Sequence, residues 1–142
     1  MQICRSELFR RWVGLSVFVI CFCPLVSSAT PVLRCHFEVN AERSEIEFKP
    51  VADPYLVESV NLADRFRFKA VVLGDQNKVD LINLYVSYQT RRQPMILQHS
   101  KFIAPLAQVN AKPDALTGRV ALYSPFLGKE LQYGCALHEV LP

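Results

Sequence analysis

Apolar and polar residues alternate with a period of two along most of this chain, and this period decides what the chain can fold into. In the segment 34–39, for example, every second residue is apolar and the residues between them are charged or imidazole side chains. Successive side chains of a β-strand point to opposite faces of a sheet, so the pattern is typical of half-buried strands. It predicts about seven strands, over 34–39, 45–49, 64–73 (with an extension back toward 58), 79–90, 95–103, 117–124 and 130–140.

Seven short strands joined by turns predict an all-β fold, a single antiparallel β-sandwich of about the size of an immunoglobulin-like domain. A small closed β-barrel is the alternative, because its end strands pair and would place the first strand beside the last. The same parity predicts a set of side chains that face the core: Phe37, Phe48, Phe66, Phe68, Ile82, Leu84, Leu131, Tyr133 and Leu137.

The first 29 residues have the order of a secretory signal peptide. Arg5, Arg10 and Arg11 precede an uncharged, mostly apolar stretch over 12–26, and small residues lead up to Ala29. Fifteen helical residues span about 22 Å, which is short of the ~30 Å hydrocarbon core of a membrane. We therefore expect cleavage after Ala29, one domain over 30–142, no transmembrane segment after cleavage, and a periplasmic or extracellular location.

Two of the five cysteines, Cys35 and Cys135, remain after this cleavage. A pair of cysteines in an exported chain predicts one disulfide bond. Bridging these two closes a loop of about 100 residues, for which the chain-entropy model gives roughly 4.7 kcal/mol of stabilisation. A redox-active pair is the other interpretation, but such pairs usually have the Cys-x-x-Cys spacing, which this chain lacks.

The residue patterns of common enzymes are missing from the sequence. It has no Gly-x-Ser-x-Gly nucleophile elbow, phosphate-binding loop, dinucleotide-binding glycine pattern or His-Glu-x-x-His zinc motif. We therefore expect a protein that is not an enzyme and that needs no cofactor.

His36 and His138 are weak candidates for a metal site. Each lies at an odd offset from one of the two cysteines, so a bond between Cys35 and Cys135 would leave both imidazoles on the opposite face of the sheet. Two imidazoles are too few for a firm zinc or copper site, and the alternative is two surface histidines. We expect no metal.

Basic residues and a tyrosine gather in the middle of the sequence. Arg65, Arg67 and Lys69 alternate with apolar residues along one strand, and Tyr85 has the opposite parity to Tyr88. Such residues can bind nucleic acid, but residues 30–142 hold thirteen Lys or Arg and twelve Asp or Glu, a net charge of +1. We expect no nucleic acid, and an anionic envelope component as the alternative partner.

Recognition in a β-sandwich usually lies on its loops. The longest irregular segment is 104–116, which contains Pro105 and Lys112, and Arg91 and Arg92 form a basic corner at a strand end. The chain is thus expected to be a non-catalytic binding or adaptor module of the cell envelope whose partner is another envelope protein or an anionic component. The alternatives are a carrier of an apolar ligand, with a cavity lined by the core phenylalanines, and a metal-binding protein.

The signal-peptide interpretation predicts that the exported protein begins at Thr30. It should then show tyrosine but no tryptophan fluorescence, because Trp12 is the only tryptophan of the chain. Intact-mass measurement of exported material tests this, and a chain that still carries Met1 would contradict it.

Overall fold

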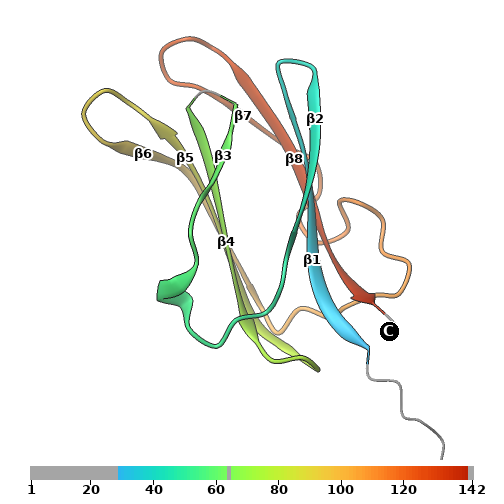
Figure 1. Ribbon diagram of the computed structural model, residues 1–142. Helices are drawn as coiled ribbons and strands as arrows, with labels where there is room; N and C mark the ends of the chain where they lie inside the picture. Colours follow the sequence, from blue (N-terminus) through green and yellow to red (C-terminus); the bar gives the residue numbers. More distant parts are fainter. Residues whose placement is uncertain (1–28, 64, 141–142) are drawn as a thin grey trace, which may run out of the picture.

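The computed structural model describes residues 29–63 and 65–140, and its strands form two antiparallel sheets that face each other (Figure 1). One sheet has the order β2-β1-β8-β7 and is called sheet A; the other has the order β3-β4-β5-β6 and is called sheet B. The strands are β1 (Thr30–Val39), β2 (Glu42–Phe48), β3 (Val60–Leu62), β4 (Phe66–Gly74), β5 (Val79–Gln89), β6 (Pro94–Ile103), β7 (Val120–Tyr123) and β8 (Glu130–Val140). The predicted β-sandwich is confirmed, and the closed barrel is wrong because neither sheet closes on itself.

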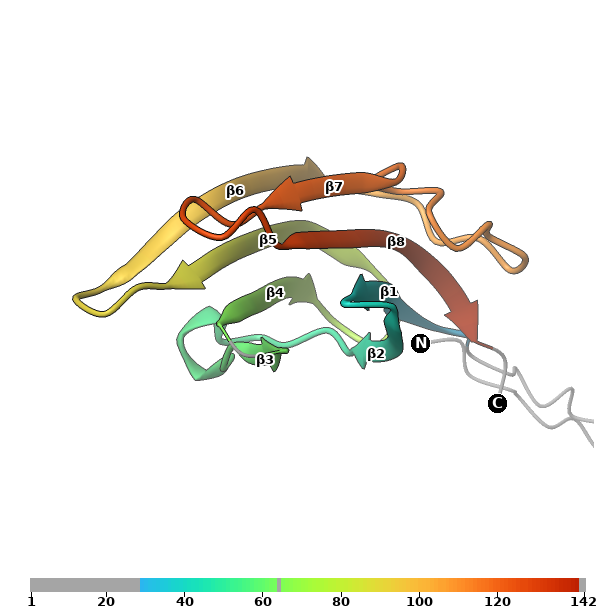
Figure 2. The same ribbon diagram turned by 90° about the horizontal axis from the view of Figure 1, so that it is seen from above.

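The hairpin turns and the chain ends lie at opposite ends of the sandwich. The turns of the four hairpins β1–β2, β3–β4, β5–β6 and β7–β8 lie at one end, the top of Figure 1. The start of β1 and the end of β8 lie at the other end. Seen from above in Figure 2, β6 and β7 lie at one side of the sandwich, and β2 and β3 lie at the other. Among the described residues, no helix is long and apolar enough to cross a membrane.

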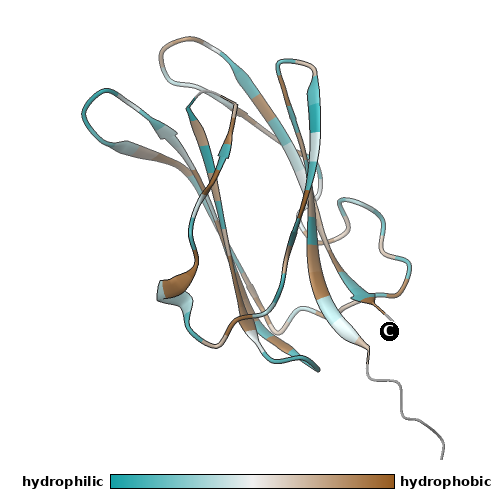
Figure 3. Cartoon of the chain, in the orientation of Figure 1, coloured by the Kyte–Doolittle hydropathy of each residue, from teal (hydrophilic) through white to brown (hydrophobic). Residues whose placement is uncertain are grey.

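Alternation places the core between the sheets, and brown and teal segments follow each other along the strands in Figure 3. Eight of the nine residues predicted to face the core are buried, and the ninth, Phe48, is half-buried and packs against them. The ring of Phe68 joins the sheets: its centroid lies 4.8 Å from that of Phe37 and 5.4 Å from that of Tyr133. The core phenylalanines that the carrier hypothesis placed around a cavity are thus packed in the core, as Phe66 and Phe68 show.

The predicted strand over 64–73, extended back toward 58, is two strands, and this part of the prediction is wrong. The chain turns after Leu62, where Ala63 has a φ of 34° and its carbonyl accepts hydrogen bonds from the amides of Arg65 and Phe66. Leu62 and Phe66 then lie directly opposite each other. Because three residues separate them, both sides of the turn keep the same parity, and the period of two continues through it.

The disulfide between Cys35 and Cys135 is confirmed, and it lies within sheet A. The two residues are opposite each other in the β1–β8 register, with their Cα atoms 4.1 Å apart, and neither is exposed to solvent. It therefore joins the first strand to the last in the middle of one sheet. The barrel alternative had also placed these two strands side by side, but in a closed sheet.

Replacing both Cys35 and Cys135 by alanine should lower the free energy of unfolding by up to about 4.7 kcal/mol, because the unfolded chain gains the freedom of a loop of about 100 residues. Urea unfolding of the parent and the double variant under non-reducing conditions measures the difference. Equal midpoints would show that the pairing of β1 with β8 needs no covalent link.

Candidate functional site

The outer face of sheet B collects most of the basic and aromatic residues that the sequence had suggested, but Arg65, predicted to lie on the same strand, is in the turn that precedes β4. Phe66, Phe68 and Ala70 of β4 point into the core, so Arg67 and Lys69 between them lie on the outer face. The register places Lys69 of β4 opposite Tyr85 of β5, and Tyr85 opposite His99 of β6. Lys101 lies two residues after His99 on β6, opposite Asn83. We call Arg67, Lys69, Tyr85, His99 and Lys101 the basic face.

Two rings stand at the centre of the basic face. Those of Tyr85 and His99 are stacked, with their centroids 4.4 Å apart and an interplanar angle of 3°. The Nε2 atom of His99 lies 3.3 Å from Oδ1 of Asn83. The rings therefore support each other, and the imidazole has a polar partner in Asn83.

The structure adds Lys101 to this face, which sequence analysis missed. A single regular strand over 95–103, as predicted from the sequence, would put Leu97, His99 and Lys101 on the same side. The register shifts at Val86 and Ser87, opposite a β-bulge in β6, so Leu97 packs against the core while Lys101 and Ile103 are exposed. The charge of Lys101 was the available signal, because a lysine seldom faces a core.

The two sheets carry opposite charge. The strands of sheet B contain three basic residues and one acid, Asp80, which is paired with Lys78 outside the strands. The strands of sheet A contain two arginines and six glutamates. Arg67, Lys69 and Lys101 make no ion pair with any described residue, whereas the arginines of sheet A are all paired.

The outer face of sheet A is a ladder of opposite charges between β1 and β2. The register places Arg34 opposite Glu47, His36 opposite Glu45, and Glu38 opposite Arg43. The shortest distances are 2.6 Å from Arg34 Nη2 to Glu47 Oε1, 3.2 Å from His36 Nδ1 to Glu45 Oε2, and 3.2 Å from Arg43 Nε to Glu38 Oε2. Cross-strand pairs of opposite charge stabilise this register.

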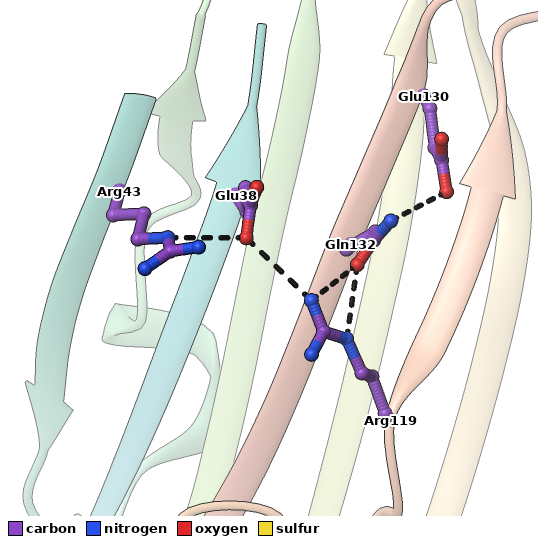
Figure 4. Close-up of polar contacts among 5 residues, drawn as sticks. All are labelled: Glu38, Arg43, Arg119, Glu130 and Gln132. Atoms are coloured by element: carbon purple, nitrogen blue, oxygen red, sulfur yellow. Dashed lines mark hydrogen bonds and ion pairs between the residues drawn. The ribbon is translucent and has the colours of Figure 1, made fainter. Parts of the chain in front are cut away.

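Figure 4 shows how this ladder continues across β8. Arg119, which precedes β7, lies 3.5 Å from Glu38 Oε2 and donates two hydrogen bonds to Oε1 of Gln132, at 2.9 and 2.6 Å. Gln132 in turn donates to Oε1 of Glu130, at 2.8 Å. The charged groups on this side of the molecule therefore already bind one another.

A groove of about 570 Å³ lies between this network and Pro113 and Asp114 of the loop before β7. Gly134 lines it, and a Cβ atom at this position would lie 2.9 Å from the Cβ atom of Asp114, so a larger residue would force the chain around Asp114 to shift. Its walls include His36, Glu45 and Arg43. A ligand here would have to replace existing ion pairs, which makes the groove a weaker candidate than the basic face.

The segment that contains Pro105 and Lys112 covers an edge of β8. The amide of Gln108 donates to the carbonyl of Leu137 at 3.0 Å, and the amide of Cys135 donates to Oγ1 of Thr117 at 2.8 Å. The loop thus takes the place of a strand beside β8, beyond the end of the shorter β7. Pro105 is half-buried and Lys112 is exposed, and neither belongs to the basic face.

The Arg91–Arg92 corner is the turn of the β5–β6 hairpin, at the hairpin end of sheet B. Thr90 fixes this turn: its Oγ1 atom donates to the carbonyl of Gln93 at 2.6 Å and accepts the amides of Arg92 and Gln93. Both arginines are exposed. The structure therefore separates the two recognition elements predicted from sequence, because the corner belongs to sheet B and the loop covers sheet A.

His36 and His138 both lie on the outer side of sheet A, as predicted. In the β1–β8 register, however, His138 pairs with Val32, four residues from His36. That is about 13 Å along the strands, too far for two imidazole nitrogens to bind one ion at about 2.1 Å. The described residues contain no group of three or more His, Cys, Asp or Glu that could hold a metal ion.

The comparisons with known proteins give no further guide to function. No family model, no curated protein and no solved structure matches this chain.

Burial, together with the positive charge of Arg34 and His36, lowers the pKa of His138 below its usual value of about 6.5, against the weaker opposing effect of Glu45 and Glu47. The unfolded chain therefore binds a proton that the folded protein does not, and the free energy of unfolding should fall as the pH drops through about 6.5. Urea unfolding between pH 7.5 and 5 should show a smaller decline in a His138→Gln variant. An unchanged decline would assign the pH dependence to other groups.

Proposed function

We propose that this chain is an exported, non-catalytic binding module of the cell envelope that binds an anionic envelope component across its basic face. The single observation that carries the proposal is the contrast between the two sheets. The cations of sheet A are held by glutamates, whereas Arg67, Lys69 and Lys101 of sheet B have no ionic partner among the described residues. Unpaired cations on one face attract an anionic ligand to that face.

The spacing of the basic face suits a ligand with several negative charges. Neighbouring strands lie about 4.8 Å apart, and residues two apart on a strand lie about 7 Å apart. Lys69 lies in the same row as Tyr85 and His99, and Lys101 is two residues further along β6. The two lysines are therefore separated by two strand spacings and by two residues along the strand, roughly 12 Å in all. Phosphate or carboxylate groups repeated along a polymer, or lipid headgroups in a membrane, would meet more than one cation at a time.

Export is part of this proposal and rests on two observations. The buried disulfide suits an oxidising compartment, and the sequence of residues 1–29 has the order of a signal peptide. Apart from Ala29, that segment lies outside the described residues. The absence of enzyme motifs supports a binding role. The turn fixed by Thr90 adds two exposed cations, Arg91 and Arg92, at one end of the same sheet.

Reversing two charges of the basic face should weaken anion binding at least tenfold. The variant is Lys69→Glu with Lys101→Glu; its matched control is Lys49→Glu with Lys112→Glu, which makes the same change in net charge at exposed positions outside sheet B. Titration with polyphosphate and sedimentation with phosphatidylglycerol vesicles, each at two salt concentrations, measure binding and separate a soluble polymer from a lipid surface. Neutral phosphatidylcholine vesicles serve as the blank.

The control variant should bind within about threefold of the parent. If both variants lose affinity equally, the attraction depends on net charge alone and the basic face is not a site. If the parent binds neither probe above the blank, the proposed function is wrong.

A further inference from the structure

Two open sheets leave four edges, and exposed edges are usually blocked against pairing with other chains. In this fold β3 has only three residues and β7 only four. The edge strand β2 carries Glu45 and Glu47 on its outer side, and both are engaged by β1. These three edges are therefore short or charged.

Irregular segments cover the places where the short edge strands end. Beside β4, beyond β3, the amide of Val51 donates to the carbonyl of Val72 at 2.8 Å. Beside β8, beyond β7, Gln108 and Thr117 make the contacts described above. The chain thus pairs the inner strands even where no regular strand is available.

The remaining edge, β6, is treated differently. It has ten residues, and from Gln98 to Ile103 it pairs with β5 without a break in register. That stretch is about 20 Å long, and within the described residues its other side has no backbone hydrogen bond to any segment. It carries one formal charge, Lys101, and its last residue, Ile103, is 76% exposed.

The β1–β2 pair shows what kind of strand fits such an edge. On β1, the outer residues Arg34 and His36 lie two apart and receive Glu47 and Glu45 of β2. On β6, His99 and Lys101 likewise lie two apart on the outer face. An incoming strand with carboxylates at alternate positions would meet them as β2 meets β1.

The inner side of the edge is polar at Gln98 and Ser100, which are hydrogen-bonded to each other, and apolar at Phe102, so it favours an apolar residue opposite Phe102. Phe102 is half-buried and packs against the core. In β2, the corresponding inner positions hold Ile46 and Phe48, which pack against the same core. A strand added beside β6 would cover the exposed part of Phe102 with such a side chain.

We propose that residues 98–103 of β6 are a docking edge for an extended segment of a partner protein in which acidic and apolar residues alternate. The segment adds a fifth strand to sheet B, with backbone hydrogen bonds supplying affinity and the carboxylates opposite His99 and Lys101 supplying register. A second copy fits less well, because pairing residues 98–103 of two molecules brings their two Lys101 cations close to each other. This site goes beyond the proposed function, since it uses the strand edge of β6 and needs no polyanion.

A peptide that copies residues 42–48 is the probe, because β2 is a strand of the required pattern. It is titrated to millimolar concentration into the disulfide-bonded protein without any polyanion, and backbone amide signals and their hydrogen exchange are followed by NMR. We expect shifts and slower exchange confined to 98–103. The same peptide with alternate backbone nitrogens methylated should bind at least tenfold more weakly, because it cannot form the ladder.

Lys101→Glu should weaken the peptide at least tenfold, and Lys49→Glu, the matched change at an exposed position outside sheet B, should not. Protection on β1 instead of β6 would mean that the peptide displaces β2 and would overturn the proposal. Equal binding of the methylated peptide would overturn it too, as would a molecular mass that rises with protein concentration through pairing at β6. Because polyphosphate and vesicles are absent, failure here leaves the basic face to its own test.

Discussion

The pairing of β1 with β8 is the interaction on which the rest of the structure depends. These strands match over ten register positions in the middle of sheet A, and the Cys35–Cys135 bond joins them at the centre of that match. The outer strands β2 and β7 each have only one neighbour in the sheet, β1 and β8 respectively. Sheet B is held against this centre by side-chain packing, notably that of Phe68 on Phe37 and Tyr133. Losing the central pair would therefore release both the sheet and the surface that sheet B packs on.

Alternation predicts the fold and most of the core from sequence, because one side of every strand must leave water. The prediction fails at turns and bulges, because the amino-acid sequence does not show whether they keep or change the face to which alternate side chains point. The three-residue turn between Leu62 and Phe66 keeps the alternation in phase, so the sequence pattern does not reveal the β3–β4 hairpin. The bulge in β6 changes the phase, so the pattern assigns Lys101 to the wrong face of the sheet. At the start of β1, residues 31–33 are all buried, so that end of the strand shows no alternation at all.

The candidate site was only partly predictable for a related reason. Parity alone places Arg67, Lys69 and Tyr85 away from the core, but it does not say which strands are neighbours. The order β4-β5-β6 sets Lys69, Tyr85 and His99 in one row. That the arginines of sheet A are neutralised depends on the pairing of β1 with β2, and that pairing comes from the three-dimensional structure.

The position of β8 also sets the order in which the fold can assemble. A chain synthesised from its N-terminus has all of sheet B before its last strand exists, and the β3–β4, β4–β5 and β5–β6 contacts are close in sequence. Until β8 is made, the β1–β2 hairpin lacks the strand that pairs with β1 at Leu33 and Phe37. A two-stranded hairpin alone is barely stable. Contacts between residues about 100 apart form slowly. Premature termination before β8 would thus yield a finished basic sheet attached to an unfinished acidic one, a species with an open apolar surface and a tendency to aggregate.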